Sequence, residues 1–259
     1  MSESYYNNLA PYYKYVYRDW ESSVARQAGQ LDAVIRHYFP GTTRILDAAC
    51  GIGTQAIGLA QLGYRLSAAD ISPAAVVAAH ADAGERGLEI EFAVGDMRHA
   101  DETFPSLFDL VIACDNAVPH LLTDVDILQA FEAFHRCTTS QGGCIISVRD
   151  YTDVQPNGVH FNPRIVHDTP DGKLVLFDLW AFEGEYYDLT TYVIEDDGEW
   201  ASVQALRGGR YYCVPLSRLE VLLREAGFKQ VEILKDAFFQ PLLVGIKDPG
   251  FRIQDQRVK

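Results

Sequence analysis

Small residues and acids stand in a fixed order near the ends of three apolar runs. The stretch D-x-x-C-G-x-G, from Asp47 to Gly53, overlaps the end of the apolar run 44–49 and precedes a helix-like segment. Glycines there let the backbone approach a ligand without a Cβ in the way. Asp70 closes a second apolar run, and Asp96 follows a third. An acid at the end of the second strand of a β-α-β unit is well placed to bind ribose hydroxyls.

Two common phosphate-binding loops do not fit this stretch. A nicotinamide-binding turn has the form G-x-G-x-x-G, but Ala56 stands where the third glycine would be. A phosphate-gripping loop needs Gly-Lys followed by Ser or Thr, which is absent here. Taken singly, each acid could be a helix cap and the glycines a tight turn without a ligand. Their shared order and spacing favour a ligand site.

At these residues the chain resembles the class I S-adenosylmethionine-dependent methyltransferases, and the resemblance covers residues 5–246. It implies that S-adenosylmethionine is the cofactor and S-adenosylhomocysteine the product. It also implies roles for ten residues: Ala49, Gly51 and Gly53 against the methionine portion, Asp70 on the ribose, Ile71 beside the adenine, Asp96 on the adenine amino group, Met97 through its backbone amide, and Trp20, Arg26 and Cys114 around them. Arg26 would reach the cofactor's carboxylate, or else stand as a solvated surface arginine.

Two further segments stand at the expected ends of the next strands, where a substrate would meet the cofactor. They are CDNAVPHL, residues 114–121, and VRDY, residues 148–151. An arginine just past a central strand is costly to bury unpaired, so Arg149 suits a bidentate grip on a carboxylate. The alternative is a salt bridge from Arg149 to Asp150 or Asp115.

Both segments look like those of the glycine and sarcosine N-methyltransferases. The resemblance implies that Asn116 orients the substrate, Arg149 binds its carboxylate and Tyr151 shapes the pocket. Asp115 departs from that pattern, which has glycine at this place, and a carboxylate here favours a cationic or larger amine. His120, just past the fourth strand, is a candidate general base or a satisfied structural histidine.

The expected reaction is methyl transfer from S-adenosylmethionine to the nitrogen of a small carboxylate-bearing amine. Holding the amine close to the sulfonium and in line with it would supply most of the catalysis. An amino-sugar N-methyltransferase or a natural-product O-methyltransferase fits the same cofactor residues. A module that binds the cofactor without turnover is the alternative of another class. The seven histidines show no ligand spacing, so no metal is expected.

The overall composition restricts the partners. The chain has 259 residues, a formal net charge of -14 and a pI of about 4.8. Such a surface repels phosphate backbones, so nucleic acids and acidic membranes are not expected as partners. The five cysteines form no C-x-x-C pair and predict free thiols in a reducing compartment. We expect a cytoplasmic enzyme, monomeric or homo-oligomeric, that acts on a small molecule.

The alternation of apolar runs with helical patterns predicts an α/β fold with a doubly wound, Rossmann-like, seven-stranded sheet. The strands are expected at 44–49, 64–70, 90–94, 108–114, 144–149, 230–234 and 241–246. Residues 141–143 are expected to turn into the fifth strand, and residues 101–106 to form a loop. A helix over 216–226 is expected to be capped by Ser217.

The expected organisation has five parts: an N-terminal lid and helix at 1–40, the cofactor-binding core at 41–150, an antiparallel β insertion over the active site at 151–212, the C-terminal part of the core at 213–247 and a tail at 248–259. The first part holds a dense cluster of tyrosines. It would close over cofactor and substrate and exclude water. Otherwise its tyrosines pack on the edge of the sheet or form a subunit contact.

Overall fold

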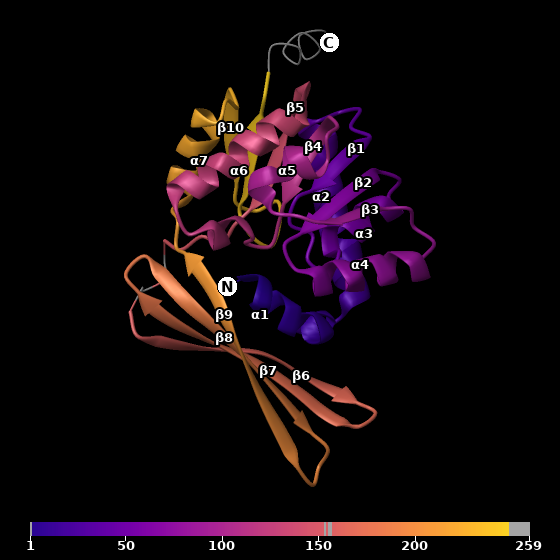
Figure 1. The fold of residues 1–259 in the computed structure, drawn as a ribbon, viewed down its shortest axis with the longest axis vertical. Helices are drawn as coiled ribbons and strands as arrows, with labels where there is room; N and C mark the ends of the chain where they lie inside the picture. Colours follow the sequence, from indigo (N-terminus) through magenta and orange to yellow (C-terminus); the bar gives the residue numbers. More distant parts are fainter. Residues whose placement is uncertain (1, 153, 155–156, 249–259) are drawn as a thin grey trace.

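A seven-stranded sheet forms the centre of the molecule, with strand order β10-β11-β5-β4-β1-β2-β3 (Figure 1). The computed structural model describes residues 2–152, 154 and 157–248, so the expected tail lies outside the described residues except for Asp248. Neighbours among β1 to β5 run parallel, and β11 is antiparallel to both β5 and β10. The strands are β1 (Arg44–Asp47), β2 (Arg65–Asp70), β3 (Glu91–Val94), β4 (Phe108–Ala113), β5 (Thr138–Ser147), β10 (Gln230–Leu234) and β11 (Leu242–Ile246).

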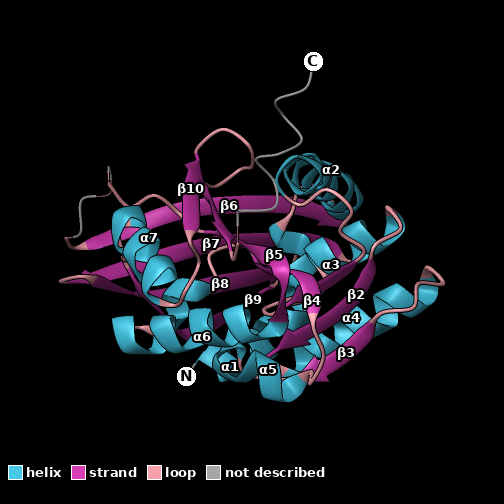
Figure 2. Ribbon diagram, turned by 90° about the horizontal axis from the view of Figure 1, so that it is seen from above, coloured by secondary structure: helices cyan, strands magenta, loops and turns pink. Residues whose placement is uncertain are grey.

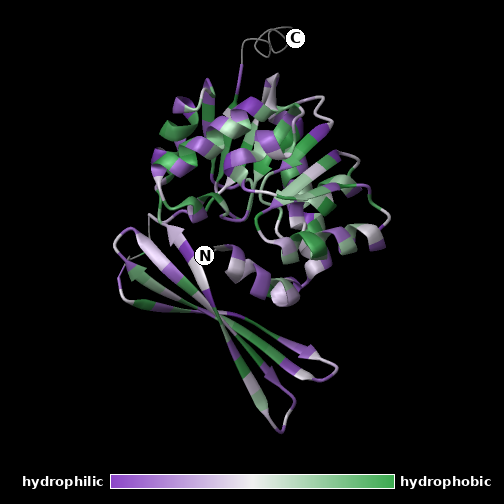
Figure 3. Cartoon of the chain, viewed as in Figure 1, coloured by the Kyte–Doolittle hydropathy of each residue, from purple (hydrophilic) through white to green (hydrophobic). Residues whose placement is uncertain are grey.

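Helices cover both faces of this sheet (Figure 2). One face carries α2 (Trp20–Tyr38), α3 (Thr54–Gln61) and α4 (Pro73–Glu85), and the other carries α5 (Ala100–Thr103), α6 (Asp124–Cys137) and α7 (Leu216–Glu225). Strands buried on both faces must be apolar throughout, and hydrophobic residues concentrate there (Figure 3). The predicted doubly wound sheet is therefore confirmed. None of the helices among the described residues is long and apolar enough to cross a membrane.

The antiparallel insertion is a second sheet of four strands, β6 (Val159–Thr169), β7 (Gly172–Glu183), β8 (Tyr186–Asp196) and β9 (Ala201–Tyr212). The short helix α1 (Ser2–Leu9) lies between this sheet and the core (Figure 1). Tyr5 and Leu9 of α1 are buried against Leu176 and Leu189 of the four-stranded sheet. The 3-10 segment η1 (Ala10–Val16) then leads into α2.

Three local predictions are wrong. Residues 101–106 do not form only a loop, because α5 occupies their first half and its Asp101 pairs with Arg136 of α6. Ser217 does not cap α7, since the helix begins after an extended Pro215 that offers no capping side chain. Residues 141–143 do not precede the fifth strand, because β5 already begins at Thr138, although its pairing with β4 shifts register between Thr138 and Gly143.

The two glycines in β5 serve close packing rather than a turn. A Cβ on Gly143 would collide with the carbonyl oxygen of Gly245 in β11 and with the ring of Phe39. Glycine is the residue that allows a neighbouring backbone to approach this closely within a sheet.

Gly143→Ala should therefore destabilise the fold by about 1–3 kcal/mol, the usual effect of overpacking a core. Urea denaturation of the purified variant measures this change. Gly84→Ala is the matched control, because a Cβ at Gly84 meets nothing within 4 Å and the helix α4 should gain up to about 1 kcal/mol. Equal destabilisation of both variants would contradict the packing argument.

A fully buried carboxyl group ends β1. Asp47 has 0% exposure, its Oδ1 accepts one distant hydrogen bond from the Ala49 N–H at 3.4 Å, and its Oδ2 has no partner among the described residues. Burial raises the pKa of Asp47 to about 7, and the charge of Asp70 raises it further. The protonated form is the one that this site accommodates.

Because the pKa of Asp47 is higher in the folded chain than in the unfolded one, its contribution to stability is fully present below pH 3.8 and is lost as the pH rises through about 7. Asp47→Asn removes this ionisation. The thermal midpoint of the variant, without cofactor, should fall less than that of the wild type between about pH 5.5 and about pH 8. Parallel pH dependences in the two proteins would show that Asp47 ionises elsewhere.

Candidate active site

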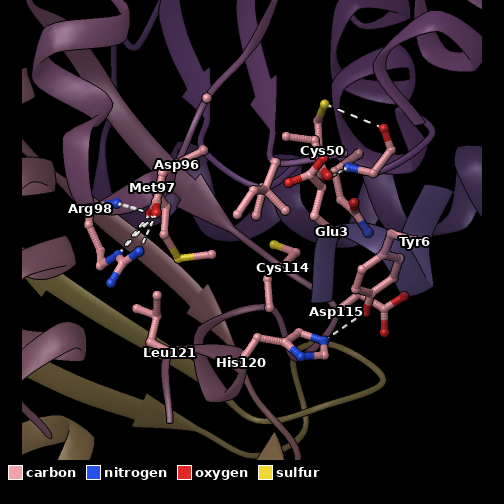
Figure 4. A pocket seen from close by; sticks show the side chains of 18 of the residues that line it. Glu3, Tyr6, Cys50, Asp96, Met97, Arg98, Cys114, Asp115, His120 and Leu121 are labelled. Atoms are coloured by element: carbon pink, nitrogen blue, oxygen red, sulfur yellow. Dashed lines mark hydrogen bonds and ion pairs between the residues drawn. The ribbon is translucent and has the colours of Figure 1, made fainter. Parts of the chain in front are cut away.

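A cavity of about 360 Å³, called here the large cavity, opens where β1, β2, β3 and β4 end (Figure 4). Ligands of open α/β sheets bind at this edge, outside the carboxyl ends of the strands. Glu3 and Tyr6 of α1 form part of its wall. Seven of the ten predicted cofactor-binding residues line it: Ala49, Gly51, Asp70, Ile71, Asp96, Met97 and Cys114.

Asp70 is oriented by two backbone N–H groups from different loops. Gly51 donates to its Oδ2 at 2.8 Å, and Ser72 donates to its Oδ1 at 2.9 Å. Burial raises the pKa of Asp70, while these two hydrogen bonds lower it. The carboxylate that joins the two loops therefore also faces the large cavity, where its remaining lone pairs can accept from hydroxyl groups.

Asp96 is held by an arginine that the sequence pattern did not single out. Arg98 donates to it from the backbone at 2.9 Å and from Nη2 at 2.6 Å, and also reaches Asp126 of α6 at 2.7 Å (Figure 4). Burial disfavours the charge of Asp96, but Arg98 outweighs it and leaves the pKa below its ordinary value. Ile71 lines the same cavity with an exposed apolar side chain, a surface suited to an aromatic ring.

Three predicted cofactor residues do not line the large cavity. Gly53 lies behind it with φ +90°, and a Cβ there would crowd Ile57 of α3. Trp20 packs against Ile52 and Ile57 on the far side of the glycine loop. Arg26 is exposed and lines a separate cavity of about 420 Å³, called here the open cavity. Their roles in cofactor binding stay predictions.

A third, much smaller cavity of about 70 Å³ adjoins the large cavity and shares Tyr6, Tyr13 and Asp115 with it. We call it the small cavity. The predicted substrate residues Asn116 and Arg149 both line it. The antiparallel sheet contributes a wall comprising Arg164, Trp180, Tyr187, Leu189 and Tyr211.

Asn116 connects the ends of β4 and β5. Its Oδ1 accepts from the backbone N–H of Arg149 at 2.9 Å, and its Nδ2 donates to the hydroxyl of Tyr151 at 2.9 Å. Its backbone has φ +66°, a conformation that asparagine tolerates better than most residues. Asn116 therefore positions Arg149 and Tyr151, and Tyr151 contributes through this bond rather than by lining the small cavity.

Arg149 carries its charge beside aromatic side chains. Its guanidinium lies 4.3 Å from the centre of the Trp180 ring, and Nη1 donates to the Tyr187 hydroxyl at 3.3 Å. Within the described part of the chain it forms no ion pair, and Asp150 lies near Lys235 instead, at 3.6 Å. The salt bridge to Asp150 or Asp115, left open by the sequence, is thus not formed.

His120 lies in a line of hydrogen bonds on the wall of the large cavity. Its Nδ1 must donate to the Arg210 carbonyl at 2.9 Å, which leaves Nε2 to accept from the Tyr6 hydroxyl at 2.8 Å (Figure 4). Tyr211 can then donate to the Tyr6 oxygen at 3.1 Å. Burial lowers the pKa of His120 to about 4, so the imidazole is neutral and binds a further proton weakly.

Asp115 stands where all three cavities meet. It has φ +54°, an uncommon backbone conformation for a residue with a side chain. Its Oδ2 accepts from the Tyr17 hydroxyl at 3.3 Å. Burial raises the pKa of this carboxyl group, while Arg164 and Arg149 lower it. A carboxylate at this junction can accept hydrogen bonds from a cationic or neutral amine.

Comparison with known proteins finds a family model and several relatives that resemble this chain. Residues 45–142 match the family model described as "Methyltransferase domain". A protein of Geobacillus sp. (strain WCH70) that is named a methyltransferase is 25% identical over 224 residues, 85% of each chain. The glycine/sarcosine N-methyltransferase of Halorhodospira halochloris is 27% identical over 141 residues. That match covers 54% of this chain and 52% of the relative, so it spans about half of each protein.

The fold has a solved counterpart in S-adenosylmethionine-bound CalS10, an amino pentose methyltransferase from Micromonospora echinaspora. The TM-score is 0.75 with 17% identity, and the match covers 87% of this chain and 92% of that one. At this identity the likeness shows the fold alone. The family model over residues 45–142, the curated relatives named methyltransferases and the shared fold together support a class I S-adenosylmethionine-dependent methyltransferase.

Proposed function

We propose that the chain transfers the methyl group of S-adenosylmethionine to the nitrogen of a small amine that carries a carboxylate. The observation that carries this proposal is Arg149, a cation in the small cavity beside the large one that forms no ion pair among the described residues. A charge withdrawn from water is costly unless it is paired. A ligand carboxylate would supply that pairing through charge-assisted hydrogen bonds.

The large cavity would hold the cofactor. Asp70 and Asp96 would bind the nucleoside part, while Ala49 and Gly51 would lie along the methionine part. Bound S-adenosylmethionine supplies an activated methyl group, so the protein's task is to bring a nitrogen close to it and in line with it. The observation in favour is that these residues line one cavity at the carboxyl edge of the sheet.

The small cavity would hold the acceptor in a single orientation. Arg149 would bind the acceptor's carboxylate, and Asp115, which faces both cavities, would meet its amine. The nitrogen would thereby point toward the large cavity. The volume of about 70 Å³ favours an acceptor of few atoms over a sugar or a polycyclic phenol.

Release of S-adenosylhomocysteine with glycine, sarcosine, dimethylglycine, larger amino acids, amino sugars and phenols tests the proposal. We expect turnover on amines with a carboxylate. Arg149→Ala should raise KM for such an acceptor by about tenfold or more, because hydrogen bonds to charged groups contribute about 1.5–3 kcal/mol. KM for S-adenosylmethionine should stay near the wild-type value.

Arg36→Ala is the control, since Arg36 is a solvent-exposed arginine of α2 paired with Asp32 and lines none of the three cavities. It should leave both KM values unchanged. Turnover restricted to sugars or phenols would overturn the proposed acceptor, as would unchanged acceptor kinetics in Arg149→Ala.

His120 gives a separate prediction for the pH dependence. With a pKa of about 4 it is neutral throughout the usual assay range, so kcat/KM should show no ionisation near 6.5. The profile should instead rise as the acceptor amine loses its proton. His120→Asn should lower kcat by releasing Tyr6, without changing the shape of the profile. A limb near pH 6.5 that disappears in this variant would make His120 the general base.

A further inference from the structure

Arg164 reaches the small cavity because of an irregularity in β6. The pairing of β6 with β7 shifts between Pro163 and Ile165, so Arg164 is the extra residue of a β-bulge in an edge strand. Bulges re-aim side chains and occur near active sites. Arg164 lines the small cavity and the open cavity, and 30% of its side chain stays accessible.

A buried line of hydrogen bonds fixes this arginine. Arg164 Nε donates to Asp178 Oδ2 at 2.6 Å, and the Thr191 hydroxyl donates to Asp178 Oδ1 at 2.6 Å. The hydrogen of Thr191 is then engaged, so the Tyr5 hydroxyl must donate to the Thr191 oxygen, at 2.7 Å. Burial raises the pKa of Tyr5 to about 12, so this donor keeps its proton. Tyr5, Asp178 and Thr191 are each 1% exposed.

This line of hydrogen bonds leaves the Nη1 and Nη2 edge of the Arg164 guanidinium without a partner among the described residues. Only Nε of Arg164 is engaged, and neither Nη1 nor Nη2 has a partner within the described part of the chain. Two parallel N–H groups on one edge match the two oxygens of a carboxylate. Asp178 already compensates the charge of Arg164, so this edge adds donors to the small cavity without adding net charge.

Tyr5 brings the N-terminal helix into the same line. It lies on α1, and the next residue, Tyr6, lines both the large and the small cavity. Thr191 follows a second shift of register, between Leu189 and Thr191 in the pairing of β8 with β9. Two irregularities of the four-stranded sheet thus lie at residues of the line that connects α1 to Arg164.

We propose that Arg164 is a second carboxylate-binding residue of the small cavity, and that Tyr5, Thr191 and Asp178 are positioning residues that couple it to the docking of α1. This inference rests on the proposed function, because it concerns the same acceptor. It adds that the acceptor's carboxylate lies between two guanidinium groups, one from the core and one from the antiparallel sheet.

Steady-state kinetics with sarcosine as acceptor test the coupling. Thr191→Val keeps the shape of the side chain but removes both hydrogen bonds, whereas Thr191→Ser keeps the hydroxyl and serves as the control. We expect about a tenfold rise in the KM for sarcosine in Thr191→Val and near wild-type values in Thr191→Ser. Thr191→Val with wild-type KM values would overturn the positioning roles.

Arg164 itself is tested by Arg164→Lys, which keeps the charge and loses the paired N–H groups. It should raise KM for sarcosine by about tenfold or more and leave KM for S-adenosylmethionine unchanged. Tyr5→Phe should raise both KM values, because α1 borders both cavities. In the double variant that carries both Arg164→Lys and Tyr5→Phe, the fold-increase in KM for sarcosine should be smaller than the product of the two single-variant increases. Independent effects would overturn the coupling.

Limited trypsin cleavage at Lys14 and Arg18, just after α1, measures the docking of α1 and does not require an acceptor. Ligand-free Thr191→Val and Tyr5→Phe should be cleaved faster there than the wild type and Thr191→Ser. Equal rates would overturn the link to α1.

Calorimetric titration of sarcosine into the S-adenosylhomocysteine complex separates the two proposals. Failure of the wild type to bind would overturn the proposed function, whereas binding that is equal in the wild type and Arg164→Lys would overturn only the role of Arg164.

Discussion

The charge of Arg149, which forms no ion pair among the described residues, is the constraint around which the three parts of the molecule are arranged. The core supplies the arginine at the end of β5 and orients its backbone through Asn116. The antiparallel sheet supplies Trp180 and Tyr187, which contact the guanidinium without neutralising it. The N-terminal helix closes the remaining side with Tyr5 and Tyr6. Each part lines the small cavity, and the carboxylate present there, Asp115, forms no ion pair with Arg149 in the described part of the chain.

Two adjacent residues with unfavourable backbone conformations lie where the large and small cavities meet. Asp115 and Asn116 are consecutive residues with positive φ, and both directly follow β4 and Cys114. Ser147 holds them, because its hydroxyl accepts from the Asp115 N–H and its carbonyl accepts from the Asn116 N–H. Such conformations cost on the order of 1–3 kcal/mol each and persist only where the surroundings enforce them. The strain keeps a carboxylate at the one point shared by the three cavities.

The sequence predicts the elements whose signals are local. Ser72 caps α4 by accepting a hydrogen bond from the Ala75 N–H, and such a cap is visible in the sequence because it depends on residues three positions apart. The glycine loop after β1 and the acids after β2 and β3 also lie in the expected order around one cavity. By contrast, Gly143 carries the same local signal as a turn glycine, and only the presence of β11 and Phe39 reveals its packing role.

Arg164 shows most clearly what sequence patterns miss. Pro163 and the bulge interrupt the alternation of β6, so this strand gives no clear period and its arginine no assigned face. Its partner Asp178, and Thr191, which donates to Asp178, come from two other strands and are brought together only by sheet register. Trp180 and Tyr187 are missed for the same reason. In the sequence they resemble ordinary strand residues, and only the position of the four-stranded sheet beside the core shows that they line the small cavity.

In the proposed arrangement the open cavity would give the active site a second entrance. It shares Arg149, Arg164 and Asp115 with the small cavity, but only Asp115 with the large one. An amine and a nucleoside cofactor would therefore come and go by different routes, meeting at a single carboxylate. With such routes, the spent cofactor could be replaced while the amine stays in place. Such an arrangement would allow more than one methyl group to be transferred to the same nitrogen before the amine is released.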